Sequence, residues 1–117
     1  MPLPDELRLK HMLDATRLAL EHVAGKSRQD LDASQLLVAA LTRWIQVIGE
    51  AARNVSAETR DRAPRIPWNQ IVGARHVIVH EYFQVDLDVL WQIVTVDLPQ
   101  LVGAIEELLA PPASPTS

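Results

Sequence analysis

The sequence predicts an all-α fold, a single up-and-down bundle of four main helices joined by short helical turns. Apolar residues recur at spacings of three and four along four long segments, which is the period of one helix face. No segment shows the convincing alternation of apolar and polar residues that indicates a half-buried strand. The 117 residues suffice for one domain with one hydrophobic core, and we expect that domain to occupy residues 1–110.

The first half of the chain contains two predicted helices. The first runs from Asp5 to Val23, with acidic residues suited to a helix N-terminus and Gly25 as a stop signal. A polar connector over 27–34 leaves room for one helical turn. The second helix runs from about Ala33 to Asn54 and has a wide apolar face. Such a face favours burial on more than one side, by neighbouring helices or by a second subunit.

The segment after the second helix is rich in prolines and arginines. Ser56 can cap a short helix that Pro64 would close. Pro67 is typical of a first helical residue, which predicts the third helix over 67–79. A short bend is expected at 81–85.

The fourth helix is predicted over 87–109, with Asp86 as its N-cap. Its apolar residues alternate in steps of four and three, the seam pattern of a helical bundle. We expect Pro99 to kink it mildly, because the carbonyl four residues earlier loses its donor. The Pro-, Ser- and Thr-rich tail, residues 111–117, is expected to be disordered.

Composition limits the function classes. The formal net charge of −4 argues against broad electrostatic capture of nucleic acid, so any RNA chemistry must use a local basic cleft. The arginines at 60, 62 and 65 are better explained as a solvated face than as an RNA track. The chain has no cysteine, which excludes disulfides and cysteine-based zinc sites and fits a reducing cytoplasm. We expect no signal peptide and no membrane-spanning helix, and therefore a cytoplasmic protein.

One short segment, 75–82, gathers the side chains that could carry chemistry. It holds Arg75, His76, His80, Glu81 and Tyr82. Cleavage of RNA without a metal needs a base for the 2′-hydroxyl, a donor for the leaving 5′-oxygen and a cation for the charge on phosphorus. Histidine can serve in either proton role near neutral pH, and arginine can bind two phosphate oxygens at once.

The spacing of Arg75 and His80 sets a geometric condition. Five residues along an ideal helix correspond to about 500°, so the two side chains would point about 140° apart. One straight helix therefore cannot direct both at one phosphate. Either the helix ends near His80, or two copies of the segment meet across a two-fold axis, which would place two arginines and two histidines in one cleft.

His76 and His80 also have the spacing of metal ligands on one helix face. The zinc-protease pattern needs a glutamate directly after the first histidine, where this chain has Val77. No other histidine or carboxylate is placed by the sequence to complete a site, so we expect no metal ion and no cofactor.

The motif Arg-x-x-x-x-His-x-Tyr, here Arg75, His80 and Tyr82, resembles that of HepT toxins in the HEPN superfamily. The resemblance extends over most of the chain. The blocks that carry it are Val47–Ala52, Ile66–Trp68, Ile71–Gly73, Val85–Asp86 and Leu98–Pro99. This chain differs at His76, where members commonly have Asn; both side chains can hydrogen-bond to phosphate.

The resemblance implies a HEPN bundle that forms a homodimer or a higher oligomer, with a metal-independent endoribonuclease site built from Arg75 and His80. His76 and Glu81 would be auxiliary. The product would carry a 2′,3′-cyclic phosphate. It also implies a toxin of a type II or type VII toxin–antitoxin system, neutralised by an MntA-like minimal nucleotidyltransferase that transfers AMP to Tyr82. The added phosphate would repel the RNA phosphate.

Two other functions stay open. A non-catalytic helical adaptor would bind a nucleotidyltransferase without cutting RNA, and a metal-binding bundle would lose stability or activity with a chelator. Each motif residue also has a structural explanation. Arg75 could pair with Glu50 or Glu81, His80 could stabilise a helix C-terminus, and Tyr82 could pack over the bend.

Overall fold

The computed structural model describes residues 4–79 and 84–110, and these residues are helical except for their connections. The elements in order are α1 (Asp5–Val23), α2 (Arg28–Ala33), α3 (Gln35–Arg53), α4 (Ala57–Asp61), α5 (Trp68–Ile78), α6 (Leu87–Gln92), the π-helical turn η1 (Ile93–Asp97) and α7 (Leu98–Leu109). No strand occurs in these two ranges. The predicted all-α class is confirmed, whereas the predicted tail 111–117 lies outside the described residues.

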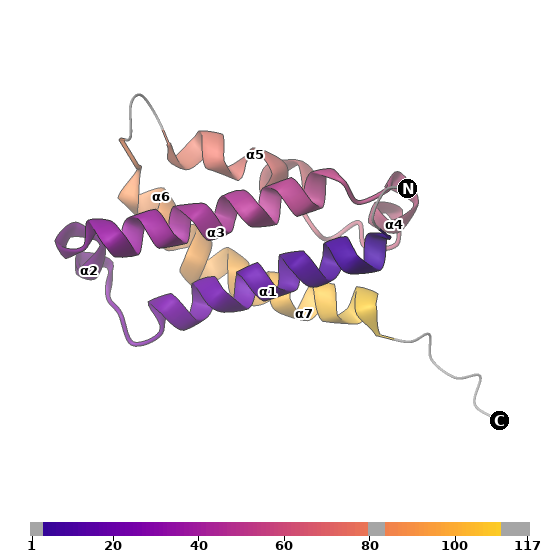
Figure 1. The fold of residues 1–117 in the computed structure, drawn as a ribbon, viewed down its shortest axis with the longest axis horizontal. Helices are drawn as coiled ribbons and strands as arrows, with labels where there is room; N and C mark the ends of the chain where they lie inside the picture. The colour runs from indigo at the N-terminus through magenta and orange to yellow at the C-terminus, as the bar shows by residue number, and fades with distance from the viewer. Residues whose placement is uncertain (1–3, 80–83, 111–117) are drawn as a thin grey trace.

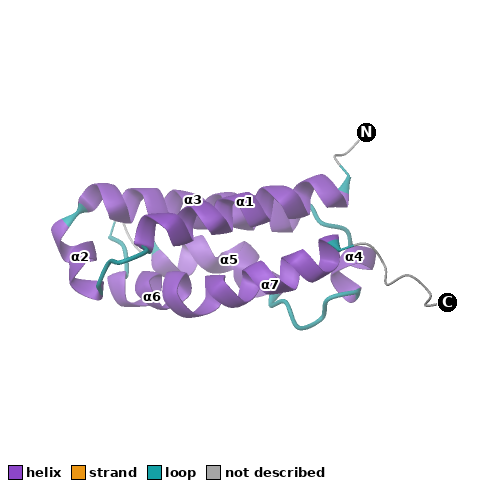
Figure 2. Cartoon of the chain, turned by 90° about the horizontal axis from the view of Figure 1, so that it is seen from below, coloured by secondary structure: helices purple, strands orange, loops and turns teal. Residues whose placement is uncertain are grey.

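The long helices lie side by side in an elongated bundle of 55 × 30 × 22 Å. Helix α3 is central, with α1 on one flank and α5 on the other, and α1 in turn contacts α7 (Figure 1). A view at right angles shows α1 and α3 in one layer and α6 with α7 in another (Figure 2). None of the described helices is long and apolar enough to cross a bilayer.

The wide apolar face of α3 is explained by this central position. Leu41, Ile45 and Ile48 are almost completely buried. Gly49 lies where α3 meets α5, and a β-carbon at this position would stand 3.0 Å from the backbone oxygen of Ile71. Neighbouring helices therefore bury α3 on two sides, which was one of the two explanations offered by its sequence.

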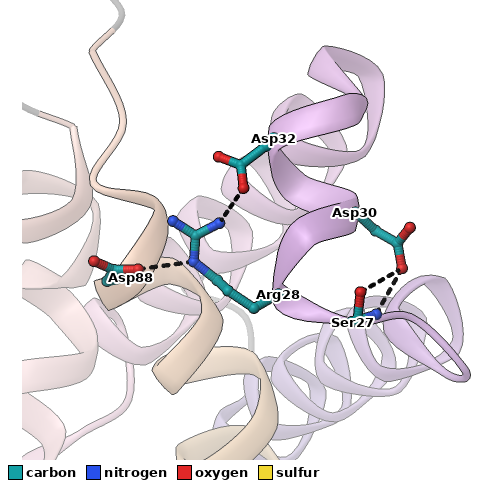
Figure 3. A network of polar contacts seen from close by, with 5 residues as sticks. All are labelled: Ser27, Arg28, Asp30, Asp32 and Asp88. Carbon is teal, nitrogen blue, oxygen red and sulfur yellow. Dashed lines mark hydrogen bonds and ion pairs between the residues drawn. The ribbon is translucent and has the colours of Figure 1, made fainter.

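The connector over 27–34 forms α2, as the sequence allowed. Ser27 and Asp30 form a capping box, in which the backbone N–H of Ser27 donates to Asp30 over 2.6 Å (Figure 3). Arg28 donates to Asp88 over 2.8 Å and to Asp32 over 3.1 Å, so it ties α2 to the first turn of α6 (Figure 3).

Helix α4 is capped by Ser56 as predicted, since its hydroxyl accepts from the N–H of Thr59. The arginine run of this region is not the uniform solvated face that the sequence suggested. Arg60 folds back onto the end of α3, donating to the carbonyl of Ala52 over 2.8 Å and lying 5.6 Å from the ring centre of Trp68. Arg65 pairs with Glu107.

The third main helix begins one residue later than predicted. Pro67 is the N-cap of α5 rather than its first residue, with φ −80° and ψ 71°. The helix ends at Ile78, and Val79 is already extended with φ −102° and ψ 110°.

The fourth main helix differs from the prediction at its centre. Asp86 caps it as expected, accepting from the N–H of Val89 over 3.1 Å. Just ahead of Pro99, where a mild kink was expected, the helix contains the wide turn η1, in which the N–H of Leu98 donates to the carbonyl of Ile93. Pro99 cannot donate to the carbonyl four residues before it, and a π turn just ahead of a proline accommodates the missing bond.

Candidate functional site

Arg75 lies in the last turn of α5, and its side chain is exposed. Within the described ranges, no carboxylate pairs with its guanidinium and no group accepts a hydrogen bond from it. Glu50, one partner considered from the sequence, instead accepts a hydrogen bond from Gln46 over 3.1 Å. The structure therefore does not pair Arg75 with Glu50, whereas Glu81, the other partner considered, lies outside the described residues.

His76 follows Arg75 on α5 and is also exposed. The two side chains leave the helix about 100° apart, so they border the same end of α5 without sharing one direction. His80, Glu81 and Tyr82 lie outside the described residues. Their roles as catalytic, auxiliary and modified residues therefore stay predictions.

The chain leaves the helical path before it reaches His80. Val79 forms an isolated antiparallel bridge with Val85, and the N–H of Asp86 donates to the carbonyl of Ile78 over 2.6 Å. These contacts join the chain just after α5 to the chain just before α6. An early end of α5 is one of the two conditions under which Arg75 and His80 could act on one phosphate.

A groove of about 900 Å³ runs along the other side of α5. Its walls are α5 and the η1–α7 segment, and Ile45 and Ile48 of α3 form part of its floor. Helix α5 contributes Gln70, Ala74 and Val77, whereas Arg75 and His76 are not among its lining residues. The groove and Arg75 therefore open on different sides of α5. Sequence reasoning missed the groove because its residues come from separate elements.

A metal centre finds no support in the part of the chain that the structure describes. Across 4–79 and 84–110, no three His, Asp or Glu side chains gather closely enough to hold one ion. His80, the second member of the His76–His80 pair, is not among these residues.

Comparisons with known proteins agree with the helical arrangement. The family model described as "Ribonuclease HepT-like" matches residues 12–108. "Putative RNase TTE0752" of Caldanaerobacter subterraneus subsp. tengcongensis is 33% identical over 101 residues, which cover 86% of this chain and 90% of that protein. "Gamma-glutamylcyclotransferase and putative RNase MJ0434" of Methanocaldococcus jannaschii is 33% identical over 89% of this chain, which spans only 47% of the relative.

A third relative, "Probable ribonuclease HepT" of Thermococcus cleftensis, is 39% identical over 59% of this chain and 63% of its own length. No solved structure matches the chain. The match to the family model covers most of the bundle, from α1 to the end of α7. The chain therefore belongs to the ribonuclease HepT-like family and has a helical bundle of the HEPN type.

Proposed function

We propose that this protein is a metal-independent endoribonuclease and the toxin of a toxin–antitoxin pair. The observation that carries the proposal is the exposed Arg75, a cation without a protein partner in the described residues, on a helix that ends two residues before His80. Membership of a ribonuclease-named family and relatives named as RNases support the same reaction.

The reaction follows from the chemistry of these groups. The 2′-hydroxyl of RNA attacks the adjacent phosphorus while a histidine removes its proton, and the bond to the 5′-oxygen breaks as a second proton is delivered. The products are a 2′,3′-cyclic phosphate and a 5′-hydroxyl. Arg75 would stabilise the charge that builds on the phosphoryl oxygens, and His80 would serve as the acid and base.

The two proton roles favour a homodimer or a higher oligomer. One His80 cannot accept and donate a proton at the same moment, whereas two copies across a two-fold axis supply one histidine for each role. His76 and Glu81 would be auxiliary groups that orient the phosphate or the histidine.

An antitoxin of the minimal nucleotidyltransferase class, similar to MntA, would control the toxin in the cytoplasm. Transfer of AMP to Tyr82 would place negative charge two residues from His80 and would exclude the RNA phosphate. The single tyrosine of the chain makes this modification simple to assign by mass spectrometry.

Growth arrest on expression tests the proposal. The wild type should stop growth and degrade cellular RNA, whereas Arg75→Ala and His80→Ala should do neither. Arg62→Ala is a matched control, because Arg62 is also exposed and outside any ion pair in the described ranges, yet lies beside α4 rather than on α5.

Two results would reject the enzyme. A harmless wild type that cuts no RNA, unchanged by either substitution, would favour the non-catalytic adaptor, which should still bind the nucleotidyltransferase. Loss of activity with a chelator would instead favour the metal-binding bundle.

A further inference from the structure

Positive charge gathers on α3 and α5, two helices that lie side by side in the bundle (Figure 1). Their charged side chains are Arg43, Glu50 and Arg53 on α3 and Arg75 on α5, to which His76 adds a titratable group. Three arginines thus accompany one glutamate on these helices, in a chain whose net charge is −4. The rest of the molecule is correspondingly more acidic.

These three arginines make no polar side-chain contacts with the described residues, a property that they share with Arg62 beside α4. Arg43, Arg53 and Arg75 are exposed, and within the described ranges none of them takes part in an ion pair or a side-chain hydrogen bond. By contrast, Arg17 pairs with Glu106, and Arg28 binds two aspartates. Within the described residues, the charges of the arginines on α3 and α5 are therefore not neutralised by a carboxylate.

Helix geometry orders the three arginines along the bundle. α5 runs antiparallel to α3, and the two helices meet where Gly49 faces Ile71 (Figure 1). At 1.5 Å per residue, Arg53 lies about 6 Å beyond this point in one direction. Arg75 lies about 6 Å and Arg43 about 9 Å beyond it in the other direction. Arg75 therefore stands between the other two, within a strip roughly 15 Å long.

The α3 arginines share the solvent face of their helix. Ten residues of helix place Arg43 and Arg53 about 80° apart, with Gln46 and Glu50 at intermediate angles. Glu50 is the opposing charge of this face, and it is hydrogen-bonded by Gln46. The face that contains these residues is left open by α1 and α5, since Arg43, Glu50 and Arg53 are all exposed.

We propose that the strip formed by Arg43, Arg53, Arg75 and His76 binds the backbone of single-stranded RNA. Arg43 and Arg53 would be substrate-binding residues that seat the strand across Arg75. This inference rests on the proposed function, which requires a phosphate at Arg75. A strip of about 15 Å can contact only a few phosphates of one strand, whereas double-stranded RNA-binding domains span about 16 base pairs. Continuity with Arg75 favours RNA over an acidic protein.

Salt dependence of binding tests the strip. The probe is a 2′-O-methyl oligonucleotide, which cannot be cleaved because it lacks the attacking hydroxyl, followed by fluorescence anisotropy over a range of salt concentrations. Arg43→Gln and Arg53→Gln should each weaken binding about three- to ten-fold at low salt and reduce the log–log salt slope by about 0.7. Arg53→Lys should keep the slope, since it keeps the charge.

Two matched variants control for nonspecific charge effects. Arg62→Gln removes an equal charge away from the strip and should leave the slope unchanged. Glu50→Gln removes the opposing charge within the strip and should tighten binding. With cleavable RNA, Arg43→Gln and Arg53→Gln should raise KM and leave kcat near the wild-type value, because these residues bind the strand and do not touch the reacting atoms.

The outcomes separate this inference from the proposed function. Cleavage by the wild type with an unaltered slope and KM in both arginine variants would overturn the strip and leave the nuclease intact. Binding that depends on Arg43 and Arg53 without any cleavage would support the strip and overturn the nuclease. The strip would also be overturned if Arg62→Gln weakened RNA binding as much as Arg43→Gln and Arg53→Gln do. It would likewise be overturned if Arg43→Gln and Arg53→Gln lost only the binding of an acidic protein partner.

Discussion

Gly49 lies at a close approach of α3 to α5, and replacing it with alanine tests how α5 is held. The added methyl group would meet the backbone oxygen of Ile71 at 3.0 Å and that of Val72 at 3.4 Å. A helical carbonyl cannot rotate away as a flexible side chain can, so α5 must shift by a few tenths of an ångström. Because α5 carries Arg75, the same shift should disturb the proposed phosphate site.

Two opposing terms determine the stability of Gly49→Ala. Alanine is favoured over glycine within a helix by about 1 kcal/mol. Overpacking of a tight contact typically costs about 1–3 kcal/mol. The free energy of unfolding should therefore fall by about 0–2 kcal/mol. Gly103, on α7, has nothing within 4 Å of the position its β-carbon would occupy. Gly103→Ala should consequently stabilise the protein by up to about 1 kcal/mol.

Urea and thermal denaturation of the two variants measure this difference. A gap of about 1–3 kcal/mol between them corresponds to a difference in Tm of several degrees for a domain of this size. RNA cleavage should fall in Gly49→Ala and remain in Gly103→Ala. Equal stabilisation by both substitutions would refute the tight contact between α3 and α5.

Two further predictions concern the contacts that hold α4. Ser56 and Thr59 donate to the carboxylate of Asp5, which lowers the pKa of Asp5 from 3.8. Because the pKa of Asp5 is lower in the folded protein than in the unfolded chain, this stabilisation is fully present above the pKa of the unfolded chain. It is lost as the pH falls through the pKa of the folded protein. Asp5→Asn should therefore lower the free energy of unfolding by about 1 kcal/mol at pH 7 and by progressively less below pH 3.8. A difference in unfolding free energy between wild type and Asp5→Asn that persists in strong acid would contradict this. Arg60→Ala should cost about 1–3 kcal/mol in denaturant unfolding, because it removes hydrogen bonds to the end of α3 and the contact with Trp68, and Arg60→Lys should not restore the loss.

Local signals predicted most of the helix boundaries. Asp5 and Val23 begin and end α1 as predicted, and Ser56 and Asp86 cap their helices. Such signals depend on neighbouring residues within one turn, so they can be recognised without knowledge of the fold. The π turn ahead of Pro99 was missed, because a proline within a helix can be accommodated by a kink, a break or a wide turn.

The sequence nominated the residues of the candidate site, whose roles stay predictions, but it could not give the surroundings of Arg75. The chemistry expected of Arg75 follows from its side chain. The spacing of Arg75 and His80 predicted either a helix end near His80 or a second subunit, and α5 ends at Ile78. The absence of an Arg75–Glu50 contact in the described residues depends on the orientation of side chains on two helices. The position of Arg43 and Arg53 beside Arg75 depends on the register set at Gly49. Neither property can be derived from spacing along the chain.

The chemical ends of cleaved RNA report directly on the proposed cleavage reaction. Purified protein should cut a single-stranded RNA in the presence of EDTA and leave a 2′,3′-cyclic phosphate and a 5′-hydroxyl, identified by mass spectrometry. Arg75→Ala should leave the RNA intact under the same conditions, whereas Arg62→Ala should cut it as the wild type does. Products with 5′-phosphate ends, cleavage abolished by EDTA, or undiminished cleavage by Arg75→Ala would contradict the account.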